Sequence, residues 1–298
     1  MALFEEHVQS AIAGGFTSVY LMGTAGEGYA LTDQQFKEAV SVFARLAVKP
    51  GLDPQAGAQI HERHGSRSGG AGERLRRRAH HRFAVVGLLP RGKADAVAGN
   101  EVAFREIPAH LGLLQYVIVN PLQPETYSQA RAMLREPWCV GIKIHPEEHR
   151  YRISEYGEEL FSFFEEIGAP VMTHSGCPNS MPADFVPIAD RHPGARVLLA
   201  HLGNGSGDES DHRPDRQVRA IQAAKHGNFW VDTSSAQSIL PGLIEWAVAE
   251  IGAERLLFGS DTPLYHVALQ RMRIEAAELS AEAKRLILRD NARKFFRL

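Results

Sequence analysis

Cysteine is almost absent from the chain, whose 298 residues include only Cys139 and Cys177. Two thiols are too few for a framework of disulfides, so we expect a protein of the reducing cytoplasm. Long apolar runs are missing as well, because no stretch approaches the roughly 18 apolar residues of a membrane-spanning helix. The first residues also lack the basic and apolar regions of a secretory signal. These absences argue against a disulfide-stapled scaffold and a membrane-spanning protein.

A charge excess of one sign is also missing, since the formal net charge is −2 at pH 7. A nearly neutral protein offers no broad surface for a polyanion, so we expect no nucleic-acid partner. The contents of 44% hydrophobic and 23% charged residues are those of an ordinary globular protein. We therefore expect a small-molecule partner, in a chain that can form a homo-oligomer.

Short apolar runs alternate with segments of helical periodicity along most of the chain. Runs typical of buried parallel strands lie at 17–22, 83–89, 114–119, 139–145, 171–174, 196–202, 228–234 and 255–261. Helical patterns lie at 4–13, 36–46, 94–111, 125–134, 153–167, 185–191, 216–225, 241–251 and 277–288. Eight strands alternating with helices predict a (β/α)8 barrel of the TIM type, with an atypical N-terminal part.

Three of these strands end in residues that can bind a metal ion, namely His174, His201 and Asp261. In a (β/α)8 barrel the carboxyl ends of the strands meet at one face, where the active site lies. Two imidazoles and a carboxylate are ligands that a catalytic Zn²⁺ accepts while one position stays open for water. The order of these residues therefore predicts a catalytic metal site at the carboxyl face.

Five motifs resemble the amidohydrolase superfamily, in particular its amidohydrolase-related branch of metal-dependent hydrolases. They are Gly-Ile-Lys-Ile-His-Pro at 141–146, Thr-His-Ser-Gly at 173–176, Ala-His-Leu-Gly-Asn at 200–204, Phe-Gly-Ser-Asp-Thr-Pro at 258–263 and Asn-Ala-Arg-Lys-Phe-Phe at 291–296. The resemblance covers about residues 100–298. It implies a divalent ion, zinc first and manganese next, that activates water, with Asp261 as metal ligand and general base and His201 as ligand or polarising group.

Further polar residues lie near the same strand ends. Lys143 and His145 close the fourth strand pattern, two positions apart and thus on one face of the strand. Lys143 is a catalytic candidate, because parts of the superfamily place a carboxylated Lys or a Glu on this strand. His145 and His266 are candidates for substrate contacts. Asp232, on the seventh strand pattern, is a candidate for orienting a ligand or contacting substrate.

The N-terminal third differs from the rest. Gly-Thr-Ala-Gly-Glu-Gly at 23–28, followed by Leu31-Thr32, resembles the dihydrodipicolinate synthase and N-acetylneuraminate lyase family, whose loop binds a keto-acid carboxylate. Thr24 matches that loop and Ala25 departs from it. Residues 48–82 show no period, and 61–82 alone hold seven Arg and four His. We divide the chain into an atypical part, 1–95, which is native or the product of a fusion or frameshift, and a barrel region, 96–298.

Three functions remain open from the sequence. The first is a metal-dependent hydrolase, or a related decarboxylase or hydratase, acting on a small carboxylate, amide or lactone. The second is a Schiff-base lyase with Lys143 as the amine nucleophile and Thr24 binding a carboxylate. The third is an inactive remnant, because the superfamily's first strand normally carries His-x-His and this sequence has no such motif.

Overall fold

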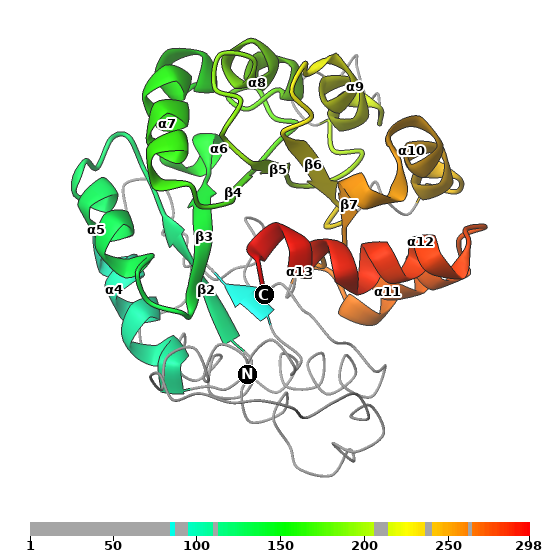
Figure 1. Cartoon of the computed structure of the whole chain (residues 1–298), viewed down its shortest axis with the longest axis horizontal. Helices are drawn as coiled ribbons and strands as arrows, with labels where there is room; N and C mark the ends of the chain where they lie inside the picture. Colours follow the sequence, from blue (N-terminus) through cyan, green and yellow to red (C-terminus); the bar gives the residue numbers. More distant parts are fainter. Residues whose placement is uncertain (1–83, 87–94, 110–112, 206–213, 236–239, 262–263) are drawn as a thin grey trace, which may run out of the picture.

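The computed structural model describes residues 84–86, 95–109, 113–205, 214–235, 240–261 and 264–298. Its strands form one sheet in which all neighbouring pairs are parallel and follow sequence order (Figure 1). The strands are β1 (Ala84–Val86), β2 (Leu113–Ile118), β3 (Cys139–Ile144), β4 (Val171–Thr173), β5 (Val197–Leu199), β6 (Phe229–Asp232) and β7 (Leu256–Leu257). They confirm seven of the eight predicted strands; the eighth, at 17–22, lies outside the described residues.

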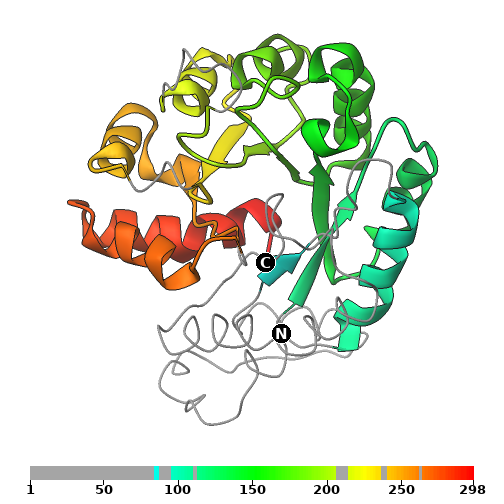
Figure 2. The same ribbon diagram turned by 180° about the vertical axis from the view of Figure 1, so that it is seen from behind.

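Helices connect successive strands and lie outside them, and three further helices follow the last described strand, β7 (Figures 1 and 2). The helices are α4 (Ala96–Glu106), α5 (Glu125–Met133), α6 (Pro146–His149), α7 (Ile153–Ile167), α8 (Pro182–Ala189), α9 (Arg216–Ala223), α10 (Leu243–Ile251), α11 (Val267–Ala276), α12 (Ala281–Arg285) and α13 (Asn291–Phe296). Parallel strands in sequence order with outer helices are the arrangement of a (β/α)8 barrel.

Most predicted helices are confirmed with small changes at their ends. The prediction for 153–167 matches α7, which ends at Gly168 because this residue adopts φ 66° and closes the helix. The helix predicted at 277–288 begins later than expected, at Ala281, and continues beyond its predicted end. Ser280 caps a new helix by accepting from the Ala283 amide, and α12 then passes through a π-helical turn, Leu286–Asp290, into α13. The predicted elements and motifs before residue 83 lie outside the described ranges.

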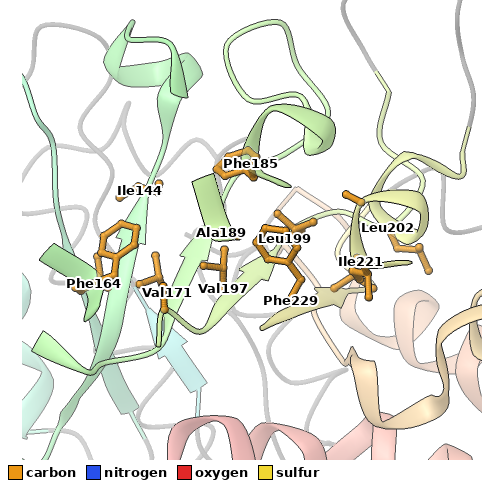
Figure 3. Close-up of a cluster of buried hydrophobic side chains, with 14 of the residues drawn as sticks. Ile144, Phe164, Val171, Phe185, Ala189, Val197, Leu199, Leu202, Ile221 and Phe229 are labelled. Carbon is orange, nitrogen blue, oxygen red and sulfur yellow. The ribbon is translucent and has the colours of Figure 1, made fainter. Parts of the chain in front are cut away.

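The strands separate an outer apolar layer from an inner one, because successive side chains point to opposite faces. Outward residues of β4, β5 and β6 pack with the helices in the larger cluster, where Figure 3 shows Phe164 of α7 near Val171 of β4. Inward residues form a second cluster with the C-terminal helix: Leu114, Tyr116, Met172, Leu198, Ala200, Leu257, Ala292, Phe295 and Phe296.

The C-terminal helix α13 closes the inner cluster. Phe296 meets Tyr116 of β2 edge-on, with ring centroids 5.7 Å apart, and Phe295 meets Trp230 of β6 at 5.2 Å. Inward positions later in the strands are polar, as at Lys143 and Asp232. Apolar packing therefore occupies one end of the barrel, which leaves the carboxyl ends of the strands for a polar site.

No helix within the described ranges combines the length and the apolar character that crossing a membrane requires.

A matched pair of leucines tests the outer layer. Leu160 of α7 is fully buried, whereas Leu269 of α11 is 53% exposed. We expect Leu160→Ala to lower the free energy of unfolding by about 2–5 kcal/mol, because it removes buried methyl groups and leaves a cavity. Leu269→Ala should change it by less than about 0.5 kcal/mol. Urea denaturation of both variants measures this, and equal losses would contradict the packing of α7 against the sheet.

Candidate active site

Polar side chains replace apolar ones where the strands end. Lys143 is an inward residue of β3, and His174, His201 and Asp261 follow β4, β5 and β7. His266 does not follow a strand directly. It is partly buried at the start of α11, where its Nδ1 accepts a hydrogen bond from the Ala268 amide at 3.2 Å. The six other predicted residues are at most 7% exposed: Lys143, His145, His174, His201, Asp232 and Asp261.

Three imidazoles from consecutive strand ends lie against one another. The rings of His145 and His174 stack with centroids 4.3 Å apart and planes 21° apart. The rings of His174 and His201 meet at 4.9 Å and 60°. Burial, followed by the charge of His201 and Lys143, holds the pKa of His174 well below its usual value, and burial acts first on His145 as well. Both rings are therefore neutral at pH 7 and carry one lone pair each.

The protonation of His201 follows from its partners. Its Nδ1 lies 2.9 Å from the Ser234 carbonyl oxygen and 2.9 Å from the Ser234 hydroxyl. That hydroxyl donates to Asp232 Oδ1 at 2.5 Å, so both Ser234 oxygens act as acceptors toward the ring. Nδ1 therefore carries the proton, and Nε2 carries the lone pair. Nε2 is buried and has no hydrogen-bond partner among the described residues, which suits a ligand to an ion.

His145 takes the opposite tautomer. It caps the short helix α6, and its Nδ1 accepts a hydrogen bond from the Glu148 amide at 3.0 Å. The lone pair of Nδ1 is thus occupied, and in the neutral ring Nε2 carries the proton. A nitrogen that carries a proton cannot bind a metal but can donate to a substrate. This geometry favours the substrate-binding role predicted for His145 over a metal-binding one.

Asp232 fixes the geometry around His201. Its Oδ1 accepts from the His201 amide at 2.9 Å, the Ser234 amide at 3.0 Å and the Ser234 hydroxyl. Gly259 makes room for this carboxylate, since a Cβ at Gly259 would lie 2.9 Å from Asp232 Cγ. The second oxygen, Oδ2, is buried and lacks a hydrogen-bond partner within the described part of the chain. The structure thus supports Asp232 as an orienting residue.

Lys143 and Asp261 have shifted pKa values because both are buried. Burial lowers the pKa of Lys143 to about 8, and the carboxylates of Asp232 and Asp261 partly oppose that shift. Burial raises the pKa of Asp261, against the opposing effects of His201 and Lys143. A lysine that loses its proton more readily and a carboxyl group that keeps one more readily are suited to moving protons near neutral pH.

The backbone is strained at two of these residues. His201 has φ 74° and Asp261 has φ 52°, in the left-handed region that side chains other than glycine rarely adopt. The turn at His201 is held by the Asp232 carboxylate and by the Leu202 amide, which donates to the Asp232 carbonyl oxygen at 2.8 Å. Backbone strain that is held in place, as at the ends of β5 and β7, is typical of functional sites.

Two residues of the site were not predicted from the sequence. Ser234 holds the tautomer of His201, and its position two residues after Asp232 on the same face was the available signal. Cys177 lies in the loop after β4, with its Sγ 3.1 Å from His174 Nε2. Nothing in the sequence pattern distinguished Cys177 from an ordinary loop residue without a role in the site.

The donor chemistry fits a divalent ion in part. His201 Nε2 and Asp261 Oδ1 are both buried and, among the described residues, have no hydrogen-bond partner. A buried nitrogen lone pair and a buried carboxylate oxygen left unpaired cost free energy unless a ligand engages them. Across the described ranges, however, no three His, Cys, Asp or Glu side chains are grouped so that they could hold a metal ion by themselves.

The amidohydrolase family model matches residues 91–298, more than half of the chain, so the chain belongs to the amidohydrolase family. This confirms the resemblance carried by the strand-end motifs, whereas the lyase-like resemblance of residues 23–32 stays a prediction. Among curated proteins, the chain is 24% identical over 131 residues to gamma-resorcylate decarboxylase of Rhodococcus jostii (strain RHA1). That match covers 37% of this chain and 36% of the relative, about a third of its length.

Solved structures share the fold of the described residues. A 2,6-dihydroxybenzoate decarboxylase in complex with 2,6-dihydroxybenzoate has a TM-score of 0.60 and 15% identity, over 95% of this chain and 99% of that one. A dihydroxybenzoic acid decarboxylase from Polaromonas sp. JS666, with bound manganese and the inhibitor 2-nitroresorcinol, has a TM-score of 0.58 and 14% identity, over 95% and 97%. These similarities confirm the predicted TIM-type barrel.

The pKa of Lys143 predicts how stability depends on pH. The pKa of Lys143 is about 8 in the folded protein and 10.5 in its ordinary, exposed state. Between these two pH values the unfolded chain holds a proton on Lys143 that the folded chain has released. Stability therefore rises with pH across that window, by up to about 3 kcal/mol for a shift of this size. We expect wild type to gain this much relative to Lys143→Met between pH 8 and 10.5, measured by urea denaturation with chelator present.

The exposed Lys225 provides the control, because its side chain is 75% exposed. The difference in stability between wild type and Lys225→Met should change far less over the same pH range, because this lysine forms only a surface ion pair with Asp190. An equally small change for Lys143→Met would show that Lys143 is not buried as the structure places it.

Proposed function

We propose that the chain catalyses the metal-assisted, non-oxidative decarboxylation of a small hydroxy-substituted aromatic acid at the carboxyl face of its barrel. The observation that supports this proposal is a pair of buried atoms without hydrogen-bond partners among the described residues, His201 Nε2 and Asp261 Oδ1, together with the charge of Lys143, which acts on Asp261. Such a site attracts an anion and supplies an acid whose pKa lies above that of an exposed carboxyl group.

Lys143 and His145 are the residues for binding the acid. Lys143 keeps its proton below a pKa of about 8 and therefore offers a buried positive charge to a carboxylate at pH 7. His145 adds the N–H on Nε2 that its capping interaction dictates. Lys143 lies on β3 and His145 follows two residues later, directly after the strand, so together the two donors can fix the orientation of one acid group.

Asp261 is the residue for moving the proton. In decarboxylation the bond between the ring carbon and the carboxyl carbon breaks, carbon dioxide leaves, and the electron pair stays on the ring carbon. That carbon then takes a proton to complete the exchange of carbon dioxide for hydrogen. Burial raises the pKa of Asp261, so this carboxyl group holds a proton more readily than an exposed one and can deliver it to the ring carbon. The enclosed position of Asp261, 3% exposed, limits competition from water.

A divalent ion completes the proposal. His174, His201 and Asp261 would hold it, and when bound it supplies Lewis-acid polarisation of substrate oxygen atoms. Manganese is bound in the Polaromonas decarboxylase, so manganese stands beside zinc as the expected ion. The remaining ligand positions would come from water, substrate or residues outside the described ranges.

The substrate class rests on the relatives. The curated relative acts on gamma-resorcylate, and the structural neighbours act on or bind dihydroxybenzoates. Hydrolysis of an amide or lactone is the second candidate, because the same residues could activate water for attack on a carbonyl carbon.

Turnover of 2,6-dihydroxybenzoate tests the proposal. With Mn²⁺ or Zn²⁺ supplied, we expect loss of the acid with equimolar phenolic product and carbon dioxide, followed by chromatography, and loss of turnover with chelator. Asp261→Asn should lower kcat by roughly 10²–10⁴-fold, because the amide cannot deliver a proton. Asp290→Asn is the matched control: this carboxylate is paired with Arg285 on the surface, and its variant should keep wild-type kcat.

Other outcomes would identify the competing functions. Turnover of lactones or amides without turnover of aromatic acids would establish the hydrolase. A covalent adduct at Lys143 after borohydride treatment with pyruvate would establish the Schiff-base lyase, since a lysine with a pKa of about 8 is a capable amine nucleophile.

A further inference from the structure

His149 is a buried histidine that the proposed reaction does not use. It is the last residue of α6 and is 2% exposed. Both ring nitrogens are buried, and within the described part of the chain neither has a hydrogen-bond partner. A donor and an acceptor buried without partners each cost free energy on folding. Such a group is expected where a ligand supplies the missing partner.

The position of His149 places it next to the candidate active site. Its amide donates at 3.0 Å to the carbonyl oxygen of His145, the N-cap residue of α6, so the two residues are one helical turn apart. The His145 ring stacks on His174 within the imidazole cluster. Lys143 and His149 also influence each other's charge, as do His145 and His149. His149 thus extends the row of polar groups from the strand end along the helix.

Hydrogen bonds fix the short helix α6, which carries His149, to the loop after β4 and at its own C-terminal end. The Glu147 carboxylate accepts from the Asn179 amide at 2.5 Å and from its side-chain Nδ2 at 2.9 Å, which ties α6 to the loop after β4. Arg150 reverses the chain with φ 57°, and the Tyr151 amide returns to the Pro146 carbonyl oxygen at 3.1 Å. These contacts fix the backbone of α6, so His149 is preorganised rather than free to turn away.

We infer that His149 is a specificity-determining residue that binds a hydroxyl group of the substrate, beside the acid group bound by Lys143 and His145. This inference rests on the proposed function and names the part of the substrate that the site distinguishes. Burial and the neighbouring Lys143 lower the pKa of His149 to about 4, so the ring is neutral at pH 7. A neutral imidazole offers one donor and one acceptor, which a hydroxyl matches and a carboxylate does not.

Two acids that differ by one hydroxyl group test the inference, 2,6-dihydroxybenzoate and 2-hydroxybenzoate. Binding is measured by calorimetry and turnover by kcat/KM, for wild type, His149→Leu, His149→Asn and the surface control His226→Leu. We expect His149→Leu to reduce the preference for the dihydroxy acid by roughly 10–100-fold, because its hydroxyl loses a buried partner. His149→Asn should restore part of the preference, and His226→Leu should leave it unchanged.

Thermal unfolding without ligand separates this role from a structural one. His149→Leu removes two unpartnered polar atoms, so its unfolding midpoint should equal or exceed that of wild type. A midpoint several degrees lower together with an unchanged preference would overturn the inference and make His149 structural. Unchanged preference with full wild-type turnover would overturn it while the proposed function stands. Hydroxyl-dependent binding without turnover would support it while decarboxylation fails, and wild-type protein that neither binds nor turns over either acid would overturn both.

Discussion

The carboxylate of Asp232 is the interaction on which the site depends. One oxygen accepts three hydrogen bonds, from the His201 amide and from both the amide and the hydroxyl of Ser234. It thereby holds His201 in a left-handed backbone conformation that costs about 1–3 kcal/mol for a residue of this kind. Through Ser234 it also fixes the proton of His201 on Nδ1. Its charge partly offsets the cost of burying Lys143. Removing this carboxylate would therefore disturb the backbone and the tautomer of His201, and also the charge balance around Lys143.

Much of this arrangement could be predicted from the sequence, because the period of two along a strand and the βα alternation are local signals. Those signals placed Lys143 and His145 on one face and put His174, His201 and Asp261 at strand ends. The backbone turn at His201 could not be predicted, since its side chain reaches the site only through a positive φ. The tautomers of His145 and His201 depend on contacts with Glu148 and Ser234, which are properties of the folded chain.

The C-terminal helices show a second limit of sequence patterns. A helical period over 277–288 predicted one helix from residue 277, whereas a serine cap starts the helix at Ala281 and a π-helical turn follows within it. The aromatic residues of α13 contact Tyr116 and Trp230 at the inner end of the barrel. Apolar packing there leaves the polar groups at the opposite strand ends, where burial rather than any single charge dominates their pKa values. The same burial makes unpartnered atoms costly, and those atoms indicate where ligands bind.

The central claim is that His201 and Asp261 are unpartnered because they bind a divalent ion. Metal content per chain tests it most directly, measured by plasma mass spectrometry on protein purified without chelators and supplied with manganese and zinc. The account predicts close to one ion per chain, or a higher integer, in wild type and in the surface control His226→Ala, with strong loss in His201→Ala at an unchanged fold. Wild-type protein without metal, or equal metal content in His201→Ala, would contradict it.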